Sequence, residues 1–255
     1  MFHIYGLLIG VGVVVALVLA VKLMKNGDDA KNMVLEAVWW MLLPGIVGAR
    51  LYHVIDQWQY YRENLILIVQ PWLGGLGIFG GVAGGVAGLF AFSLFHARRE
   101  EKKIEEIFYA IADVVSMGAS IAQAIGRWGN YFNRELYGKE TSLPWGMWVD
   151  GKSGRYHPLF IYESVLDLIL FVILLSVYKG SGKRGSTFGS YLIGYGIIRG
   201  VLEYLRVESW AIGGIPVAQA MSVVFIVSGV FVLSRKHVFI RDEDLKVKKD
   251  EDVVV

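Results

Sequence analysis

The sequence predicts an all-α protein, a polytopic membrane helical bundle with about seven transmembrane helices. The chain is 55% hydrophobic with a mean hydropathy of +0.50, and only 19% of its residues are charged, against about a quarter in soluble domains. These charges cluster between apolar runs that approach the roughly 20 residues needed to cross a bilayer. A net charge of +2 is too small to indicate a nucleic-acid partner.

Seven apolar runs are candidate membrane spans. The first has no basic region before it and no small-residue cleavage site after it, so we interpret it as a span and not as a signal peptide. The second is irregular because it contains Trp39, Trp40 and Pro44. We treat residues 1–240 as one transmembrane domain and 241–255 as a cytoplasmic, disordered tail. The predicted spans are residues 4–21, 33–51, 72–95, 108–126, 158–178, 188–205 and 216–234.

The distribution of Lys and Arg predicts the orientation. One set of alternate connections, together with the tail, holds 16 of the 25 basic residues, and the opposite loops hold seven. The positive-inside rule therefore places the C-terminus in the cytoplasm and the N-terminus outside. The outward loops 52–71 and 127–157 are rich in Trp, Tyr and Gly, which is typical of segments at the membrane–water interface. We expect the function at this outward face.

Glycines recur every four residues in the third predicted span. Small residues at this spacing let two helices approach closely in lipid, which is the simpler interpretation. A wide glycine face could instead leave room for an acyl chain or a polar head, which makes Gly80 and Gly81 candidates for substrate contact. The two series are Gly77, Gly81, Gly85 and Gly80, Gly84, Gly88.

The densest polar motif is Gly-Arg-Trp-Gly-Asn-Tyr-Phe-Asn-Arg-Glu, residues 126–135. If it is helical, Arg127, Asn130 and Arg134 fall on one face. Extension of a long side chain to water could account for Arg134 alone. For Arg127 with Asn130, Asn133 and Glu135 we favour a recognition site, because a guanidinium can donate two parallel hydrogen bonds to a lipid phosphate.

The sixth predicted span carries a second polar set. Tyr195, Arg199 and Glu203 are four residues apart and share a helix face, and Arg206 follows. Arg199 precedes Arg206 by seven residues, which places it ~10 Å into the membrane. An arginine there costs at least about 2.5–3.5 kcal/mol, so it should be paired, with Glu203 as the partner. The pair is either a structural contact or part of an anionic-lipid site.

A third polar element enters the fifth predicted span. His157 precedes Pro158, so we expect an extended residue just before a helix start. A single interfacial histidine is more often structural than catalytic. Tyr162 and Glu163 could complete the polar wall. The five histidines of the chain are scattered over both faces and indicate no metal site.

These motifs, in this order, resemble the prolipoprotein diacylglyceryl transferase family. The resemblance runs from Gly48-Ala-Arg-Leu-Tyr52 to about residue 220, and its most specific block is 126–138, followed by Thr141. Further matching blocks are 74–81, 157–163 and 195–206. The resemblance implies a multi-pass protein of the bacterial cytoplasmic (inner) membrane, with its active face outward.

The resemblance also implies a reaction, the first step of bacterial lipoprotein maturation. The diacylglyceryl group of phosphatidylglycerol is transferred to the lipobox cysteine of a prolipoprotein signal peptide, giving a thioether and glycerol 1-phosphate, without a cofactor or metal. We add six candidates for contact or catalysis, namely Arg50, Gly80, Gly81, Asn133, His157 and Tyr162. The functional core that the resemblance implies is Arg127, Asn130, Glu135, Gly138, Tyr195, Arg199, Glu203 and Arg206.

A mechanism can be assigned to these residues as a hypothesis. Arg127 and Arg206 would stabilise the phosphate and the leaving group, and Arg199 with Glu203 would orient the cavity. Glu135, with His157 as the second candidate, would accept the thiol proton. Many family members carry a histidine in the glycine block where this chain has Phe79, so the identity of the general base stays open.

Two other classes of protein are alternative interpretations of these features. A lipid transporter, or a lipid-handling protein without covalent chemistry, would also have glycine faces and buried charges. However, the chain has no evident internal repeat, and its polar groups concentrate at the outer face. An intramembrane protease is disfavoured because there is no Gly-x-Ser-x-Gly motif, no facing aspartate pair and no zinc motif. The chain has no cysteine, which excludes disulfides and a cysteine nucleophile of its own.

Overall fold

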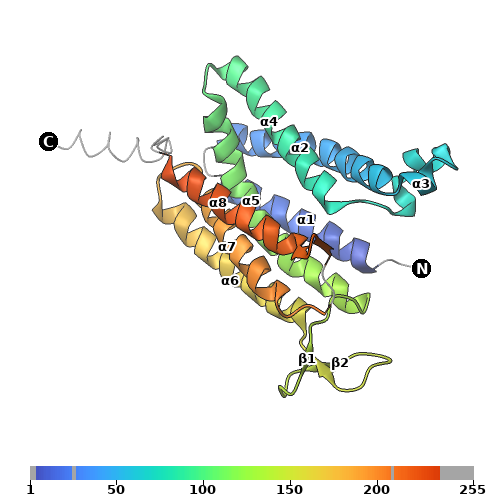
Figure 1. The fold of residues 1–255 in the computed structure, drawn as a ribbon. Helices are drawn as coiled ribbons and strands as arrows, with labels where there is room; N and C mark the ends of the chain where they lie inside the picture. The colour runs from blue at the N-terminus through green and yellow to red at the C-terminus, as the bar shows by residue number, and fades with distance from the viewer. Residues whose placement is uncertain (1–3, 25–26, 208–209, 236–255) are drawn as a thin grey trace. The chain divides into compact units, whose positions relative to one another are not determined.

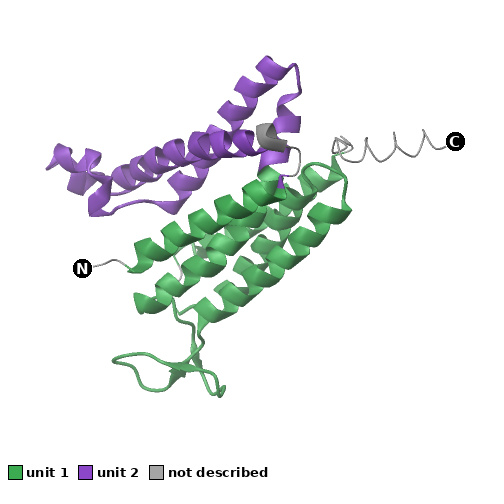
Figure 2. Ribbon diagram, turned by 180° about the vertical axis from the view of Figure 1, so that it is seen from behind, with its two compact units in different colours: residues 1–23, 112–255 green, residues 24–111 purple. Residues whose placement is uncertain are grey.

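The computed structural model describes residues 4–24, 27–207 and 210–235, so the predicted tail 241–255 lies outside them. The chain forms two compact units (Figure 2). Unit 1 comprises residues 1–23 and 112–255, and unit 2 comprises residues 24–111.

Unit 1 is a bundle of long helices that lie side by side (Figures 1 and 2). A small antiparallel sheet, in the order β1-β3-β2, protrudes beyond one end of the bundle (Figure 1). A second antiparallel pair, β4 with β5, leads into the last helix. The helices are α1 (Ile4–Leu23), α5 (Ile104–Phe132) from Ala112 onward, α6 (Leu159–Gly180), α7 (Ser186–Glu203) and α8 (Val217–Ser234); the strands are β1 (Glu140–Thr141), β2 (Met147–Trp148), β3 (Arg155–Tyr156), β4 (Ala211–Ile212) and β5 (Ile215–Pro216).

Small residues and buried hydroxyl groups hold the helices of unit 1 together. Gly12 of α1 lies so close to α5 that a Cβ there would be 3.2 Å from the backbone of Ala122. The Ser120 hydroxyl of α5 donates to the Asp167 carbonyl oxygen of α6 at 2.7 Å. The Ser164 hydroxyl of α6 donates back to the Ala124 carbonyl oxygen at 2.9 Å. From the first contact to the second, the residue number rises along α5 and falls along α6, so the two helices are antiparallel.

Unit 2 is built on an antiparallel hairpin of α2 and α4. Gly84 lies against Pro44 so closely that a Cβ would collide with the Pro44 carbonyl oxygen, and Gly85 has more room, 3.8 Å from the Met41 carbonyl oxygen. The packing interpretation is therefore confirmed for the series Gly80, Gly84, Gly88, each of which meets a carbonyl oxygen of α2. The elements are α2 (Gly27–Asp56), α3 (Trp58–Tyr61), the 3-10 helices η1 (Leu65–Val69) and η2 (Pro71–Leu73), α4 (Ile78–Glu100) and the first turns of α5.

The connection between α2 and α4 folds back onto Arg50. This side chain is 7% exposed, and its guanidinium lies 5.0 Å from the centre of the Tyr61 ring. All five N–H groups of the guanidinium donate to backbone carbonyl oxygens of the connection. The acceptors are Ile68 (3.0 Å), Gly74 (2.6 Å), Gly75 (2.9 Å), Gln70 (3.3 Å) and Leu67.

Among the described residues, six helices are long and apolar enough to cross a membrane, which supports a polytopic all-α membrane protein. They are α1, residues 31–56 of α2, α4, α5, α6 and α8. The remaining predicted span, the sixth, coincides with α7, whose hydropathy is lowered by Arg199, Glu203 and several glycines and hydroxyl side chains. Seven spans, and a single transmembrane domain over 1–240, stay predictions.

Several predicted span limits differ from the helix ends, and two of these differences fall in the motifs that the sequence singled out. The third span was expected to begin at residue 72, but α4 begins at Ile78. Gly74 and Gly75 have positive φ angles of 96° and 77°, a conformation that ends regular helix. The fourth span was expected to end at residue 126, but α5 continues to Phe132. Arg127 and Asn130 therefore lie on a rigid helix and not in a loop.

Candidate active site

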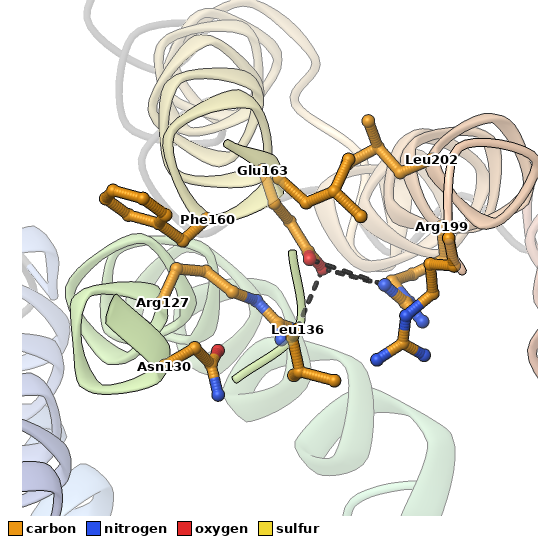
Figure 3. A pocket seen from close by; sticks show the side chains of 9 residues that line it. Arg127, Asn130, Leu136, Phe160, Glu163, Arg199 and Leu202 are labelled. Carbon is orange, nitrogen blue, oxygen red and sulfur yellow. Dashed lines mark hydrogen bonds and ion pairs between the residues drawn. The ribbon is translucent and has the colours of Figure 1, made fainter. Parts of the chain in front are cut away.

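Three helix ends of unit 1 meet around a small pocket. The C-terminal turns of α5 supply Arg127 and Asn130, the first turns of α6 supply Glu163, and the last turns of α7 supply Arg199. Figure 3 shows the Glu163 carboxylate between the Arg127 and Arg199 guanidinium groups. The pocket is lined by Arg127, Asn130, Leu136, Leu159, Phe160, Glu163, Arg199, Leu202 and Arg206.

An alternating chain of five charges runs along this pocket. Glu163 lies 2.8 Å from Arg127 Nη2 through Oε1 and 3.3 Å from Arg199 Nη1 through Oε2. Glu203 Oε2 lies 3.2 Å from Arg199 Nη2 and 3.4 Å from Arg206 Nη1. The predicted pairing of Arg199 with Glu203 is confirmed. The order is Arg127, Glu163, Arg199, Glu203, Arg206, so three cations meet two anions.

Among these five charged side chains, the arginines are more exposed than the glutamates. The side chains of Arg127 and Arg199 are 22% and 16% exposed, whereas those of Glu163 and Glu203 are 5% and 1% exposed. The carboxylates hold the guanidinium groups in place from within the protein. Within this set the three guanidinium groups exceed the two carboxylates by one positive charge, and charges interact strongly where water is scarce.

Tyr195 supports Arg127 from α7. Its hydroxyl accepts a long hydrogen bond from Arg127 Nη2 at 3.5 Å. Its ring stacks on Tyr191 with the centroids 5.8 Å apart, and the Tyr191 hydroxyl accepts from Gln123 Nε2 at 2.9 Å. The structure thus gives Tyr195 a contact with a site arginine, and its predicted contact with substrate stays a prediction.

Glu135 is held by both asparagines of the motif. Its Oε1 accepts from Asn130 Nδ2 at 3.0 Å and from Asn133 Nδ2 at 3.3 Å. Asn130 is buried and lines the pocket. Arg134 does not continue this face, because α5 ends at Phe132 and Arg134 has a positive φ of 55°. Arg134 instead pairs at the surface with Asp150.

Gly138 brings Arg206 to the site by a close backbone contact. The two residues form an isolated antiparallel β-bridge, and the Gly138 N–H donates to the His157 carbonyl oxygen at 2.8 Å. A Cβ on Gly138 would lie 2.7 Å from the His157 Cβ and 2.9 Å from the Leu205 carbonyl oxygen. A larger residue would force these neighbours to shift, so glycine at this position lets the backbone segments approach.

His157 and Tyr162 form a second hydrogen-bonded group. His157 Nδ1 lies 3.1 Å from the Tyr162 hydroxyl, which also accepts from Trp145 Nε1 at 2.8 Å. The expected helix start after His157 is confirmed, since α6 begins at Leu159 after Pro158. Both side chains lie outside the set that lines the pocket.

The central residue of the site was underrated by sequence reasoning. Glu163 was expected only to complete a polar wall, yet it joins two arginines from different helices. Asp167, one turn further along α6, was missed. It is fully buried, and its two carboxylate oxygens have no hydrogen-bond partner among the described residues. The available signal was two acids four residues apart in an otherwise apolar helix.

The remaining candidates belong to unit 2. Arg50 binds the backbone of its own unit, and Gly80 packs on α2. A Cβ added to Gly81 would lie 3.5 Å from the Ala49 Cβ, an ordinary van der Waals distance. Phe79 lies beside Tyr52 with the ring centroids 6.0 Å apart. Contact of Arg50, Gly80 and Gly81 with substrate stays a prediction. No group of three or more metal-binding side chains was found in the part of the chain that the structure describes.

The chain is similar in sequence to proteins of one known family. The family model of prolipoprotein diacylglyceryl transferase matches residues 1–235. The chain belongs to this family. It is similar to the phosphatidylglycerol–prolipoprotein diacylglyceryl transferase of Finegoldia magna, with 38% identity over 94% of both chains. Family members of that name from Clostridioides difficile (91% of both chains) and Thermosynechococcus vestitus (91% of this chain and 88% of the relative) are 35% and 33% identical.

Proposed function

We propose that this chain is the transferase that moves the diacylglyceryl group of phosphatidylglycerol to the lipobox cysteine of prolipoprotein signal peptides. The observation that carries the proposal is the alternating chain of three arginines and two glutamates, with one positive charge in excess. A phosphodiester carries one negative charge and would balance it. Membership of the family supports the same substrate.

The reaction balances as a substitution at carbon. The cysteine thiol gives its proton to a base, and the sulfur forms a bond to the terminal glyceryl carbon of the diacylglycerol. The bond between that carbon and the phosphate oxygen breaks, and glycerol 1-phosphate leaves with the electron pair. The phosphate thereby gains a second negative charge, so fixed cations stabilise the transition state more than the bound substrate.

Each residue of the ionic chain has a role in this proposal. Arg127 and Arg206, at the two ends, bind the phosphate and the leaving group. Arg199, shared between Glu163 and Glu203, is held at one orientation and shapes the pocket. A nearby cation also raises the thiolate fraction of the incoming cysteine. Glu135 and His157 remain the two candidates for the proton acceptor.

The proposed location is the outward end of a bundle in the bacterial cytoplasmic membrane. With α7 as a seventh span, the N-terminus lies outside and the C-terminus in the cytoplasm. The pocket lies at the C-terminal ends of α5 and α7 and at the N-terminal end of α6. Basic residues such as Lys22 and Lys179 lie at the opposite ends of α1 and α6, which the positive-inside rule assigns to the cytoplasm.

A transfer assay tests the proposal. Purified protein is mixed with phosphatidylglycerol and a lipobox peptide, and the expected result is a mass gain of one diacylglyceryl on the peptide cysteine. Arg127→Lys keeps the charge but loses the planar fork, so we expect kcat/KM to fall about 10²–10³-fold. Arg134→Lys is the matched control, because Arg134 is exposed outside the pocket.

Two outcomes would count against the proposal. Near wild-type transfer by Arg127→Lys would remove Arg127 from its role. Failure of the wild-type protein to modify the peptide, together with movement of labelled lipid across vesicles, would favour the lipid transporter instead.

A further inference from the structure

A buried carboxylate far from the pocket caps the helix that carries Arg199. Asp113 of α5 is 1% exposed. Its Oδ2 accepts from the Gly185 N–H at 2.8 Å, and its Oδ1 accepts from the Phe188 N–H at 2.8 Å. These are the N-cap residue and the third residue of α7, the two positions whose N–H groups a capping box satisfies.

The cap has to come from another helix, because α7 cannot provide it. Its N-cap residue is Gly185, which has a positive φ of 85° and no side chain to accept a hydrogen bond. The first N–H groups of a helix need acceptors, and a negative charge there also interacts favourably with the helix dipole. The Asp113 carboxylate satisfies both needs and joins α5 to α7 at this end.

The same two helices are joined again on the way to the pocket. Gln123 of α5 donates to Tyr191 of α7 at 2.9 Å, and Arg127 of α5 donates to Tyr195 of α7 at 3.5 Å. The residue numbers rise together on both helices, so α5 and α7 are parallel. Contacts of this kind form a ladder from the Asp113 cap to the active-site arginines.

The spacing along both helices is matched. Arg127 follows Asp113 by fourteen residues, and Arg199 follows Gly185 by fourteen residues. At 1.5 Å per residue, each arginine stands ~21 Å along its own helix from the cap. Glu163 bridges the two arginines, so the bridge depends on the position of α7 along α5.

We propose that Asp113 is a positioning residue for the transfer reaction, because its cap on α7 fixes the height at which Arg199 meets Glu163 and Arg127. The inference rests on the proposed function for its effect on rate. Asp113 is not among the residues that line the pocket, and its cap bonds reach the site through α7. A displacement of one helical residue moves a side chain by ~1.5 Å, and a misplacement of about 1 Å can cost about 10²-fold in rate.

Asp113→Asn is the primary test. The asparagine side chain has one acceptor oxygen, so it can accept from only one of the Gly185 and Phe188 N–H groups. Its NH₂ group would face the other N–H, and one of the two cap hydrogen bonds is lost. We expect kcat to fall about 10–100-fold and KM for phosphatidylglycerol to change by less than about threefold, since a flexible lipid head tolerates a small shift that the transition state does not. Ser120→Ala is the control, because it removes a buried hydrogen bond between α5 and α6 and leaves the α5–α7 ladder intact.

A distance measurement tests the register independently of activity. The chain has no native cysteine, so Phe132→Cys and Tyr204→Cys can carry spin labels at exposed positions. Phe132 lies nineteen residues after Asp113, and Tyr204 lies nineteen residues after Gly185. We expect Asp113→Asn to shift or broaden the pulsed-EPR distance distribution by on the order of 1.5 Å, and Ser120→Ala to leave it unchanged.

The outcomes separate this inference from the proposed function. Wild-type kcat, or an unchanged distance distribution, in Asp113→Asn overturns the inference. Absence of transfer by the wild-type protein overturns the proposed function, while the distance measurement still decides whether Asp113 sets the register. If Asp113→Asn does not fold, Asp113→Glu keeps the charge and lengthens the side chain, and the same two measurements apply with the same criteria.

Discussion

The molecule buries arginines in two different ways. In unit 2, Arg50 donates all five of its N–H groups to backbone carbonyl oxygens of one connection. In unit 1, Arg127 and Arg199 are held by glutamates and remain partly exposed in a pocket. The first arrangement uses every donor for the fold, whereas the second fixes the cation and keeps it available. From these partners we predict a structural role for Arg50 and a binding role for Arg127 and Arg199.

Among the tests of this comparison between Arg50 and the pocket arginines, Arg199→Lys should give the largest effect. A lysine cannot reach Glu163 and Glu203 with two separate nitrogens as Arg199 does. We expect kcat/KM in the transfer assay to fall about 10²-fold. The thermal midpoint should change little, because one ion pair is retained. A loss of stability with unchanged specific activity would assign Arg199 to the fold instead.

Arg50→Lys should produce the opposite signature. Three ammonium donors cannot serve five carbonyl oxygens, so at least two are left unpaired, at about 1–3 kcal/mol each. We expect the free energy of unfolding to fall by about 2 kcal/mol or more. The measurement is denaturant-induced unfolding of the detergent-solubilised protein, monitored by tryptophan fluorescence. If Arg50 binds substrate, as the sequence suggested, KM for phosphatidylglycerol would rise without this loss of stability.

Two neighbouring glycines test whether unit 2 is held by close backbone contact. Gly84→Ala places a Cβ against the Pro44 carbonyl oxygen and should destabilise the α2–α4 hairpin by about 1–3 kcal/mol. Gly85→Ala is its matched control, with 3.8 Å to the nearest atom, and should be neutral or stabilising by up to about 1 kcal/mol. Equal effects on the unfolding midpoint would show that this face is not the packing face.

Tyr162→Phe should give the smallest effect. It removes a hydroxyl that contacts Trp145 and His157, at a cost of about 1 kcal/mol in unfolding free energy. The Tyr156 hydroxyl contacts only a nearby carbonyl oxygen at the surface, so Tyr156→Phe is the control. A fall in kcat of more than about tenfold in Tyr162→Phe alone would favour His157 as the proton acceptor over Glu135.

The sequence predicted the helices and the pairing of Arg199 with Glu203 because both depend on local patterns. Apolar run length marks the helices, and four-residue spacing brought Arg199 and Glu203 together correctly. The central role of Glu163 could not be predicted in this way. Its partners Arg127 and Arg199 come from two other helices, and their meeting depends on the rotation and height of each helix.

Arg50 shows a second limit of sequence reasoning. Its acceptors are backbone carbonyl oxygens, and every residue has one, so the side-chain sequence does not identify them. The two glycine series of α4 were equally regular in sequence. Only the structure shows that Gly80, Gly84 and Gly88 touch the backbone of α2, while Gly81 and Gly85 have more room. Asp113 was missed because its partners are backbone N–H groups of a distant helix.

Unit 2 interrupts unit 1 along the chain, and this fixes an order of assembly. Gly12 of α1 packs on Ala122 of α5, yet the 88 residues from Met24 to Ile111 are made between Leu23 and Ala112. At a synthesis rate of about 5–20 residues per second, roughly 4–18 s pass between the synthesis of α1 and that of the part of α5 on which it packs. The contiguous α2–α4 hairpin can close during that interval. The active site is therefore completed late, when α5, α6 and α7 have all been released by the ribosome.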